Sequence, residues 1–585
     1  MTLLMNRRLL ALASCALLLA CECDKQPVVE APADAGPPVL AEKEPNDSAA
    51  AALAIDRSSI VEANLGADPG KPDSDWYAFT SSLPRTADFT VSCPPGADVA
   101  LEIVDETGSV LASVNTGGPG ASERFPNLDV SGKAFVRVVG LKKGAGGAYT
   151  LTTTFFERAP GYELEPNDRR VDASQVALGQ AVSGTVAHGG DVDWFRFELP
   201  SAAGAPAEED AGAPEDAGEA QDAGPAEPVD AGPPLPERRL ALRVDVSQVE
   251  GVSFDVQVMT EAEAVLFAAK SREGGPLSLR NVGVRESDRV IYVVLRSNPI
   301  GTGKDAKRGF NPSTSYTLTV APEEAGGSAE YEPNDERDKA TDVPANSYRE
   351  GFISPKGDVD YFRLVTDGPS IAKVQVTGVE KVDLVLSLVT VGADGKEEQS
   401  LKANEGAVKE PERLNNVFCD KSCVLRVEAA PRKVDGKWVK DDENGDQAYR
   451  LSADVVPDDG SEEREPNGTA ATATPLATGR PVRGTVFPKK DVDYFPLDLR
   501  GKQVKTPLKA TLLGVLKVDV GLYLHRVEDD GKLTLVQTAD SARGDKPETI
   551  RFSAEPGLYV FEVRDSRSRE ANFQDSYQLT VDEGE

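Results

Sequence analysis

Carboxylates and an asparagine recur in a fixed pattern four times along the 585-residue chain. Each copy opens with Glu-x-Glu-Pro-Asn and later reaches an Asp-x-Asp that is followed by aromatic residues. From the Glu before Pro to the first Asp there are 26 residues in the last three copies and 29 in the first, and such fixed spacing indicates a repeated domain. The candidate site residues are Glu42, Glu44, Asn46, Asp47, Asp73 and Asp75; Glu163, Glu165, Asn167, Asp168, Asp191 and Asp193; Glu330, Glu332, Asn334, Asp335, Asp358 and Asp360; and Glu463, Glu465, Asn467, Asp491 and Asp493.

The residue types and their spacing favour a hard divalent cation. In a strand, alternate side chains share a face, so Asp191, Asp193 and the two following phenylalanines point the same way, with the Asp pair at the rim of the core. Crowded carboxylates repel one another, and no Lys or Arg recurs at a fixed place in the motifs. Calcium takes six to eight oxygens from carboxylates, amides and backbone. The alternative is that these acids cap turns and stand in solvent.

The same inventory argues against catalysis. The chain has only His188 and His525, so it lacks the material for a His-Glu-x-x-His metallopeptidase or a His-dependent triad. An EF-hand reading with Gly445 at loop position six puts Lys440 at position one, which fails. A carboxylate group repeated four times at domain entrances indicates a structural ion rather than a glycosidase site. We therefore predict that the protein is not an enzyme.

The elements that must position these residues are strands. Short alternating runs bounded by Gly, Pro and Asp clusters are typical of a sandwich, and the fold class is all-β. Each copy ends in a Tyr-x-Leu stretch, which marks its last strand. We expect four domains, and the second contains an insertion of about 201–237 whose Asp-Ala-Gly repeats offer nothing to bury and predict disorder. The predicted domains are 42–156, 162–322, 329–457 and 462–585.

The N-terminus predicts export. An apolar run from Leu9 to Ala20 follows Arg7-Arg8 and is too short to span a membrane, so residues 1–20 are a signal peptide. Leu18-Leu19-Ala20-Cys21 resembles the bacterial lipobox, which implies acylation of Cys21 and membrane attachment through that lipid; an ordinary signal with an incidental Cys is the alternative. Residues 21–41 form a flexible tether. Because Glu22 follows the Cys, we expect an outer-membrane lipoprotein of the cell envelope that faces the periplasm or the cell surface.

The net charge argues against one class of partner, and the cysteines predict a disulfide. A formal charge of −33 excludes nucleic acid as a partner, since phosphate binding needs basic stripes. Cys419 and Cys423 lie between apolar runs, which predicts a hairpin stapled by a disulfide; no other Cys or His is near enough in sequence to complete a metal site. Cys93 is expected to be a buried apolar residue.

The Glu-Pro-Asn-Asp opening, the Gly184-Thr-Val and Gly-Asp-Val-Asp-Trp/Tyr-Phe segments, and the closing Tyr-x-Leu together resemble the bacterial pre-peptidase C-terminal domain, a family that includes collagen-binding domains of clostridial collagenases. The resemblance implies tandem jelly-roll-like β-sandwich domains. It also implies calcium on the acidic residues named above, and the fourth copy departs from the pattern at Gly468.

Such domains usually follow a secreted peptidase, and none is present in the sequence. We expect a non-catalytic surface lipoprotein whose calcium-stabilised modules bind an extracellular protein or polysaccharide. A passive surface spacer and an accessory to secreted peptidases are the alternatives. The oligomeric state is left open.

Overall fold

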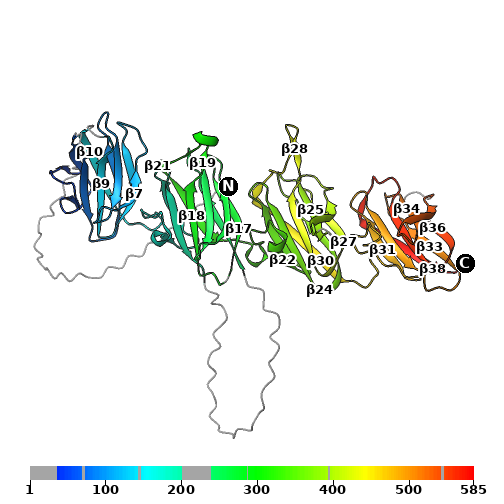
Figure 1. Ribbon diagram of the computed structural model, residues 1–585. Helices are drawn as coiled ribbons and strands as arrows, with labels where there is room; N and C mark the ends of the chain where they lie inside the picture. Colours follow the sequence, from blue (N-terminus) through cyan, green and yellow to red (C-terminus); the bar gives the residue numbers. More distant parts are fainter. Residues whose placement is uncertain are drawn as a thin grey trace, which may run out of the picture.

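The structure, a computed structural model, describes residues 36–584 apart from 67, 69–72, 143–145, 201–238, 286, 393–394 and 542–545. The predicted signal peptide, Cys21, Cys23, most of the tether and the 201–237 insertion lie outside the described residues. The described part is all-β, as predicted, and contains several β-sheet domains but no α-helix. Its helical elements are short 3₁₀ turns, and none of them is long and apolar enough to cross a membrane. Figure 1 shows the domains in a row from blue to red.

Domain 1 consists of two five-stranded sheets. In spatial order, one sheet contains β1 (Val39–Ala41), β3 (Ser59–Leu65), β10 (Gly147–Glu157), β5 (Arg85–Ser92) and β8 (Glu123–Val130). The other contains β2 (Leu53–Ile55), β4 (Ser74–Thr80), β9 (Lys133–Gly140), β6 (Val99–Val104) and β7 (Val110–Val114).

Domain 2 has the same two layers. One sheet contains β11 (Ser174–Val176), β13 (Val192–Glu198), β18 (Val290–Ser297), β15 (Phe254–Thr260) and β16 (Val265–Lys270). The other contains β12 (Ala181–Val186), β21 (Asn311–Pro322), β14 (Arg239–Val246) and β17 (Leu277–Arg285). A small hairpin of β19 (Pro299–Ile300) and β20 (Lys307–Arg308) and two 3₁₀ turns, η1 (Arg170–Asp172) and η2 (Gly303–Asp305), complete the domain.

Domain 3 differs because two long strands run through both layers and join them into one seven-stranded sheet. Its order is β23 (Tyr348–Ile353), β30 (Asn444–Pro457), β24 (Val359–Val376), β27 (Glu412–Ala429), β25 (Leu384–Val391) and β26 (Glu397–Ala403), with β22 (Thr341–Pro344) also paired to β24. The 3₁₀ turns η3 (Gly326–Ser328) and η4 (Arg337–Lys339) precede this sheet, and β28 (Arg432–Val434) and β29 (Lys437–Val439) form a hairpin that projects from it in Figure 1.

Domain 4 returns to two four-stranded sheets. They contain β31 (Val482–Val486), β38 (Asn572–Glu583), β33 (Thr506–Leu513) and β36 (Glu548–Ala554), and β32 (Val492–Asp498), β37 (Leu558–Asp565), β34 (Val520–Val527) and β35 (Leu533–Ala539).

Period-two burial builds the cores. Along β13 each alternate side chain from Asp193 to Phe197 is buried, and the side chains between them are partly exposed. Each domain has its own apolar cluster. The tyrosines of the closing Tyr-x-Leu stretches lie within these clusters, and at least 97% of the surface of each is buried. Their hydroxyl groups need polar partners there, which ties each core to the acidic motifs.

The disulfide between Cys419 and Cys423 is confirmed, but the predicted hairpin around it is wrong. Both cysteines lie in the single strand β27, opposite Ser370 and Leu364 of β24. The register of the two strands shifts between these positions, where β27 has Lys421 at φ 73°. The disulfide therefore closes within one strand, opposite an irregularity where β24 has three residues (366–368) between its paired positions and β27 has one. Cys93 is a free cysteine and only partly buried, and its thiol donates a hydrogen bond to the carbonyl of Ala97 at 3.1 Å.

Candidate cation sites

Each domain gathers its motif residues into one acidic cluster. In chain order we call them the first Glu (Glu42, Glu163, Glu330, Glu463), the second Glu (Glu44, Glu165, Glu332, Glu465), the motif Asn (Asn46, Asn167, Asn334, Asn467), the first Asp (Asp73, Asp191, Asp358, Asp491) and the second Asp (Asp75, Asp193, Asp360, Asp493). The closing Tyr is Tyr149, Tyr316, Tyr449 or Tyr577.

One backbone contact brings the two halves of the motif together. The aromatic residue after the second Asp donates its N–H to the carbonyl of the motif Asn at 3.0, 3.2, 3.1 and 3.2 Å in domains 1 to 4. The peptide bond between the second Glu and Pro is cis in all four copies. The two oxygen-rich segments that the sequence places about two dozen residues apart are therefore neighbours in every domain.

The closing Tyr connects the cluster to the core. Its hydroxyl group donates to one oxygen of the second Asp at 2.6, 2.7, 2.5 and 2.7 Å. In domains 2 to 4 it also contacts the first Glu at 3.3, 3.1 and 2.9 Å. We predicted the closing Tyr only as a strand marker, so its role in the cluster was missed. Its recurrence beside a recurring Asp was the available signal.

A glycine makes this close approach possible in domains 2 to 4. A Cβ atom at Gly184 would lie 2.3 Å from both Oε2 of Glu163 and the hydroxyl oxygen of Tyr316, and Gly351 and Gly484 are equally crowded. Ala63 pairs with Tyr149 at the matching register position in domain 1. There the hydroxyl group of Tyr149 contacts Tyr77 at 2.5 Å instead of the first Glu. In domain 1, therefore, the closing Tyr does not contact the first Glu, and Ala63 with its methyl group stands where the other domains have a glycine.

The acids come close enough to share a cation. Carboxylate oxygens of the first Glu, second Glu and second Asp lie within 4.8 Å of one another in domains 1, 2 and 3. A second triad, also within 4.8 Å, joins the second Glu to the first Asp and to Asp168 in domain 2 or Asp335 in domain 3. In domain 4 the position of Asp168 and Asp335 is held by Gly468, which supplies no side-chain oxygen.

Burial sets the charge state of these groups. Burial raises the pKa of Glu163, Glu330 and Glu463 to about 7 and that of Glu465 to about 8. The pKa of Asp193 is raised well above its ordinary range, first by burial and then by the neighbouring carboxylates. A cluster of several desolvated carboxylates needs either protons or a cation to be stable.

Three buried oxygens in the cluster have no hydrogen-bond partner and could coordinate a cation. Within the described residues, Oε1 of the second Glu, Oδ1 of the motif Asn and Oδ1 of the second Asp are buried and have no hydrogen-bond partner in each of domains 2, 3 and 4. In domain 1 this holds for Asn46 and Asp75, whereas Glu44 is exposed. Buried oxygens without a partner are rare, and here they recur at equivalent atoms. Carboxylate and amide oxygens are the ligands that calcium prefers, so the residues fit a calcium ion.

The first Asp has a second role that agrees with the turn-capping alternative. Its Oδ2 accepts the backbone N–H four residues upstream in domains 2, 3 and 4, from Ala187, Ser354 and Phe487 at 2.5, 2.7 and 2.9 Å. In domain 1, Asp73 accepts the N–H of Gly66 across a longer loop. The second Asp was expected at the rim of the core, and it is instead fully buried because the closing Tyr covers it.

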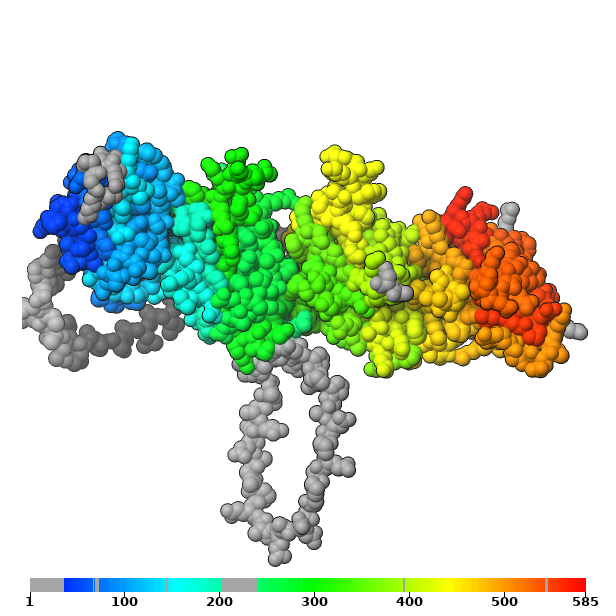
Figure 2. Space-filling view, viewed as in Figure 1, coloured from blue at the N-terminus to red at the C-terminus, as the bar shows by residue number. Residues whose placement is uncertain are grey.

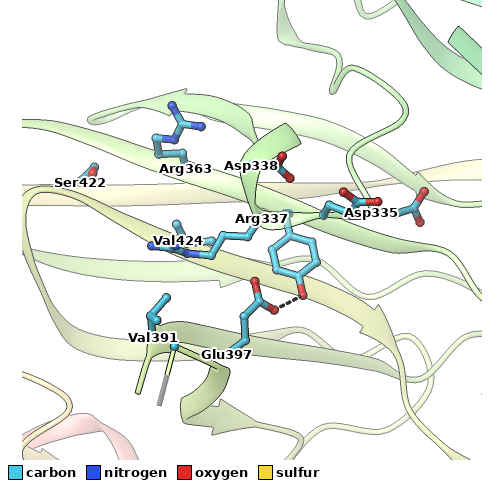
Figure 3. A pocket seen from close by; sticks show the side chains of 11 residues that line it. Asp335, Arg337, Asp338, Arg363, Val391, Glu397, Ser422 and Val424 are labelled. Carbon is cyan, nitrogen blue, oxygen red and sulfur yellow. Dashed lines mark hydrogen bonds between the residues drawn. The ribbon is translucent and has the colours of Figure 1, made fainter. Parts of the chain in front are cut away.

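The acid after the motif Asn is exposed in domains 1 and 3. Asp47 is exposed, and Asp335 lines a hollow on the surface of domain 3 together with Arg337, Asp338 and Glu397 (Figure 3). In that hollow the hydroxyl group of Tyr361 donates to Glu397 at 2.8 Å. Side chains of both charges line it, so it favours no single class of charged ligand.

No protein-family model and no curated protein matches the chain. Among solved structures, the chain is similar to the pre-peptidase C-terminal domain of a collagenase from Bacillus anthracis, at 17% identity over 19% of this chain and 93% of that one, with a TM-score of 0.15. It is also similar to the PBSX exported protein XepA, at 10% identity over 38% of this chain and 77% of that one, with a TM-score of 0.12. The likeness concerns the fold alone, and the first match spans about one domain.

Proposed function

We propose that the protein is a non-catalytic array of β-sandwich modules, stabilised by calcium, that binds an extracellular protein or polysaccharide. One observation carries the calcium assignment. The same three buried oxygens lack partners in each of domains 2 to 4, whereas the other carboxylate oxygen of the second Glu accepts the backbone N–H of the motif Asn. A cation coordinated by all three oxygens would offset the repulsion among the carboxylates.

Calcium uptake tests this assignment directly. A ligand that binds only the folded state stabilises it by about 2.7 kcal/mol at a hundredfold excess over Kd. The full chain should therefore take up calcium in isothermal titration and melt several degrees higher in calcium than in EDTA. Magnesium at equal concentration is the control, because it demands a smaller octahedral shell and gives up its water reluctantly. Equal melting temperatures in all three solutions would refute the assignment.

The proposed binding role draws on the number of modules. Linked weak modules gain about 10²–10⁴ in avidity on a repetitive target when geometry permits simultaneous contact. The full chain should be retained on an insoluble protein or polysaccharide matrix, with collagen and peptidoglycan as first probes. Uniform loss from every matrix would favour the passive spacer, and selective retention of a secreted peptidase would favour the accessory role.

We also propose anchoring in the cell envelope through an acylated Cys21, with an outer-membrane destination. Acylation would supply an apolar chain that inserts into the bilayer and holds the protein at the membrane. Cys21→Ala should move the protein from the membrane fraction to the soluble fraction or stall its processing. Retention of a cleaved, unacylated form in the membrane would contradict the anchor.

A further inference from the structure

The three junctions between domains repeat one arrangement. Asn127 in β8, Asn281 in β17 and Asn416 in β27 all have left-handed backbones, with φ of 56°, 53° and 52°. At each of them the strand's register with its neighbour shifts. A bulge of this kind leaves the extra residue unpaired within its own sheet. In all three cases its backbone and side chain pair with the following domain instead.

The backbone contact is reciprocal. The second Glu of the following domain donates its N–H to the carbonyl of the bulge Asn at 3.0, 2.8 and 2.9 Å. Its own carbonyl accepts the N–H two residues beyond that Asn, from Asp129, Gly283 and Phe418, at 2.8, 2.8 and 2.9 Å. A short parallel bridge therefore joins Leu128 to Glu165, Val282 to Glu332 and Val417 to Glu465.

The side chain of the bulge Asn reaches the candidate cation site. Its Nδ2 donates to Oε1 of the first Glu of the next domain at 3.1, 3.1 and 2.8 Å. The same Oε1 accepts a backbone N–H from Thr185, Phe352 or Thr485 within its own domain. The preceding domain thus helps to fix the orientation of one carboxylate of the acidic cluster.

A second contact locks each junction. In each, the preceding domain donates to the carbonyl at the start of the following domain's last strand: Arg124 to Pro312 at 2.8 Å, Arg280 to Gly445 at 2.5 Å and Asn415 to Phe573 at 2.9 Å. Guanidinium groups also lie over rings across two junctions, Arg280 over Phe352 at 3.7 Å and Arg413 over Phe573 at 4.6 Å. In Figure 2 the neighbouring domains are in contact without an open gap.

Two equivalent positions in the described chain, β36 of domain 4 and the first Glu of domain 1, lack the arrangement. In domain 4 the matching strand β36 pairs with β33 without a register shift. In β8 and β27 the bulge Asn stands four residues after a Glu, Glu123 or Glu412, whereas in β36 the residue four positions after Glu548 is Phe552. In domain 1 the first Glu accepts from Asn46 and from the N–H of Asn64, both within its own domain. Among the described residues, each bulge Asn lies in a domain whose next domain it contacts.

We infer that the bulge Asn residues form docking sites that read the first Glu of the next domain, so that the preceding domain is part of cation sites 2, 3 and 4. The inference deepens the proposed function and rests on it for the cation. The bulge Asn holds the first Glu in the orientation that it has within the acidic cluster, so docking should favour cation binding. Coupling between two binding equilibria is reciprocal, so the cation should favour docking to the same extent. The array is then stiffer with calcium than without it.

The test uses the full chain with three substitutions, Asn127→Gly, Asn281→Gly and Asn416→Gly. Glycine keeps the left-handed backbone and removes the side chain with its amide donor. The matched control is Asn346→Gly, another left-handed asparagine (φ 56°), whose side chain accepts from Val455 within domain 3. A second control, Asn415→Ala, removes a junction hydrogen bond that does not involve the acidic cluster. Calcium titration calorimetry measures affinity, and small-angle X-ray scattering in calcium and in EGTA measures flexibility.

We expect the triple variant to bind calcium about tenfold more weakly at three sites, which is the loss of one hydrogen bond to a charged group. Its scattering in calcium should stay that of a flexible chain, whereas the wild type and Asn346→Gly become more extended and rigid. Asn415→Ala should loosen one junction and keep its calcium affinity. Wild-type affinity and wild-type scattering of the triple variant would overturn the inference.

The scattering in EGTA separates this inference from the proposed function. If the wild type takes up no calcium, the proposed function fails, but the comparison of the two chains in EGTA still tests the docking sites. The triple variant must then be more flexible than the wild type in EGTA. Equal scattering of the two chains in EGTA would overturn the docking sites as well.

Discussion

The acidic clusters of domains 1 and 2 share one motif but differ in how tightly they are closed. Glu163 and Glu165 are buried, whereas Glu42 is partly exposed and Glu44 is exposed. Three neighbours account for the difference: Asn127 from the preceding domain, Gly184 beneath the closing Tyr, and the hydroxyl group of that Tyr on the first Glu. Domain 1 has none of these contacts among the residues described. The motif thus supplies the oxygens, and the residues around it decide how far they are desolvated.

The largest expected effect comes from the glycine beneath the closing Tyr. Gly184→Ala would place a methyl group within 2.3 Å of Glu163 and Tyr316, so that overpacking should destabilise domain 2 by about 3 kcal/mol. Urea unfolding monitored by hydrogen exchange of β12 and β21 measures it. The converse substitution in domain 1, Ala63→Gly, should cost about 1 kcal/mol or less, since it removes only one methyl group. If the two substitutions lowered the free energy of unfolding of their domains equally, Gly184 would not explain why the cluster of domain 2 is more tightly closed than that of domain 1.

Charge removal should abolish most of the calcium effect in one domain. Asp193→Asn keeps the shape of the second Asp and deletes a ligand charge, so the stabilisation of domain 2 by calcium should fall by about 2 kcal/mol. In EDTA the variant should be as stable as the wild type or more so, because it relieves repulsion among buried carboxylates. Hydrogen exchange in calcium and in EDTA gives both values. A variant that loses stability equally in the two solutions would show that Asp193 is a structural residue only.

Much of this arrangement could be predicted from the sequence, and the reason is periodicity. Strand alternation placed Asp193 on the core face with Phe195, and the repeat showed which acids belong together. The Cys419–Cys423 pair was also correct, because few other partners existed. The bulge Asn residues were not found, since their role depends on contacts between domains. Neither was the hydroxyl group of the closing Tyr, because strand alternation does not show which polar atoms meet across two sheets.

Acid should substitute for calcium in part. The pKa of Glu163 rises from 4.5 to about 7 on folding, so the folded state binds more protons between these values. Calcium-free domain 2 should therefore gain stability as the pH falls from about 7.5 to 5, by about 1 kcal/mol per pH unit. In calcium the trend should weaken or reverse, because protons compete for the same oxygens. Thermal melting across this range in EDTA checks the sign, and a loss of stability on acidification in EDTA would contradict it.

The smallest expected effect repairs the departure in domain 4. Gly468→Asp restores the carboxylate that Asp168 and Asp335 supply in the second triad, and a Cβ atom there meets only the carbonyl of Val492 at 3.3 Å. Because this position is partly open to solvent, the calcium increment should grow by less than about 1 kcal/mol. Titration calorimetry of the full chain detects it as a tighter site. An unchanged titration would mean that the acid after the motif Asn is not a ligand.

We propose that the unpartnered oxygens of domains 2, 3 and 4 are cation ligands. Hydrogen exchange of the full chain in calcium and in EDTA, followed separately in peptides of β13, β24, β32 and β4, tests it most directly. Calcium should slow exchange most in domains 2 and 3, less in domain 4, which has Gly468, and least in domain 1, whose Glu42 and Glu44 are open. Exchange that calcium does not slow in any of these strands would show that the clusters are protonated cores with no cation, and would contradict the account.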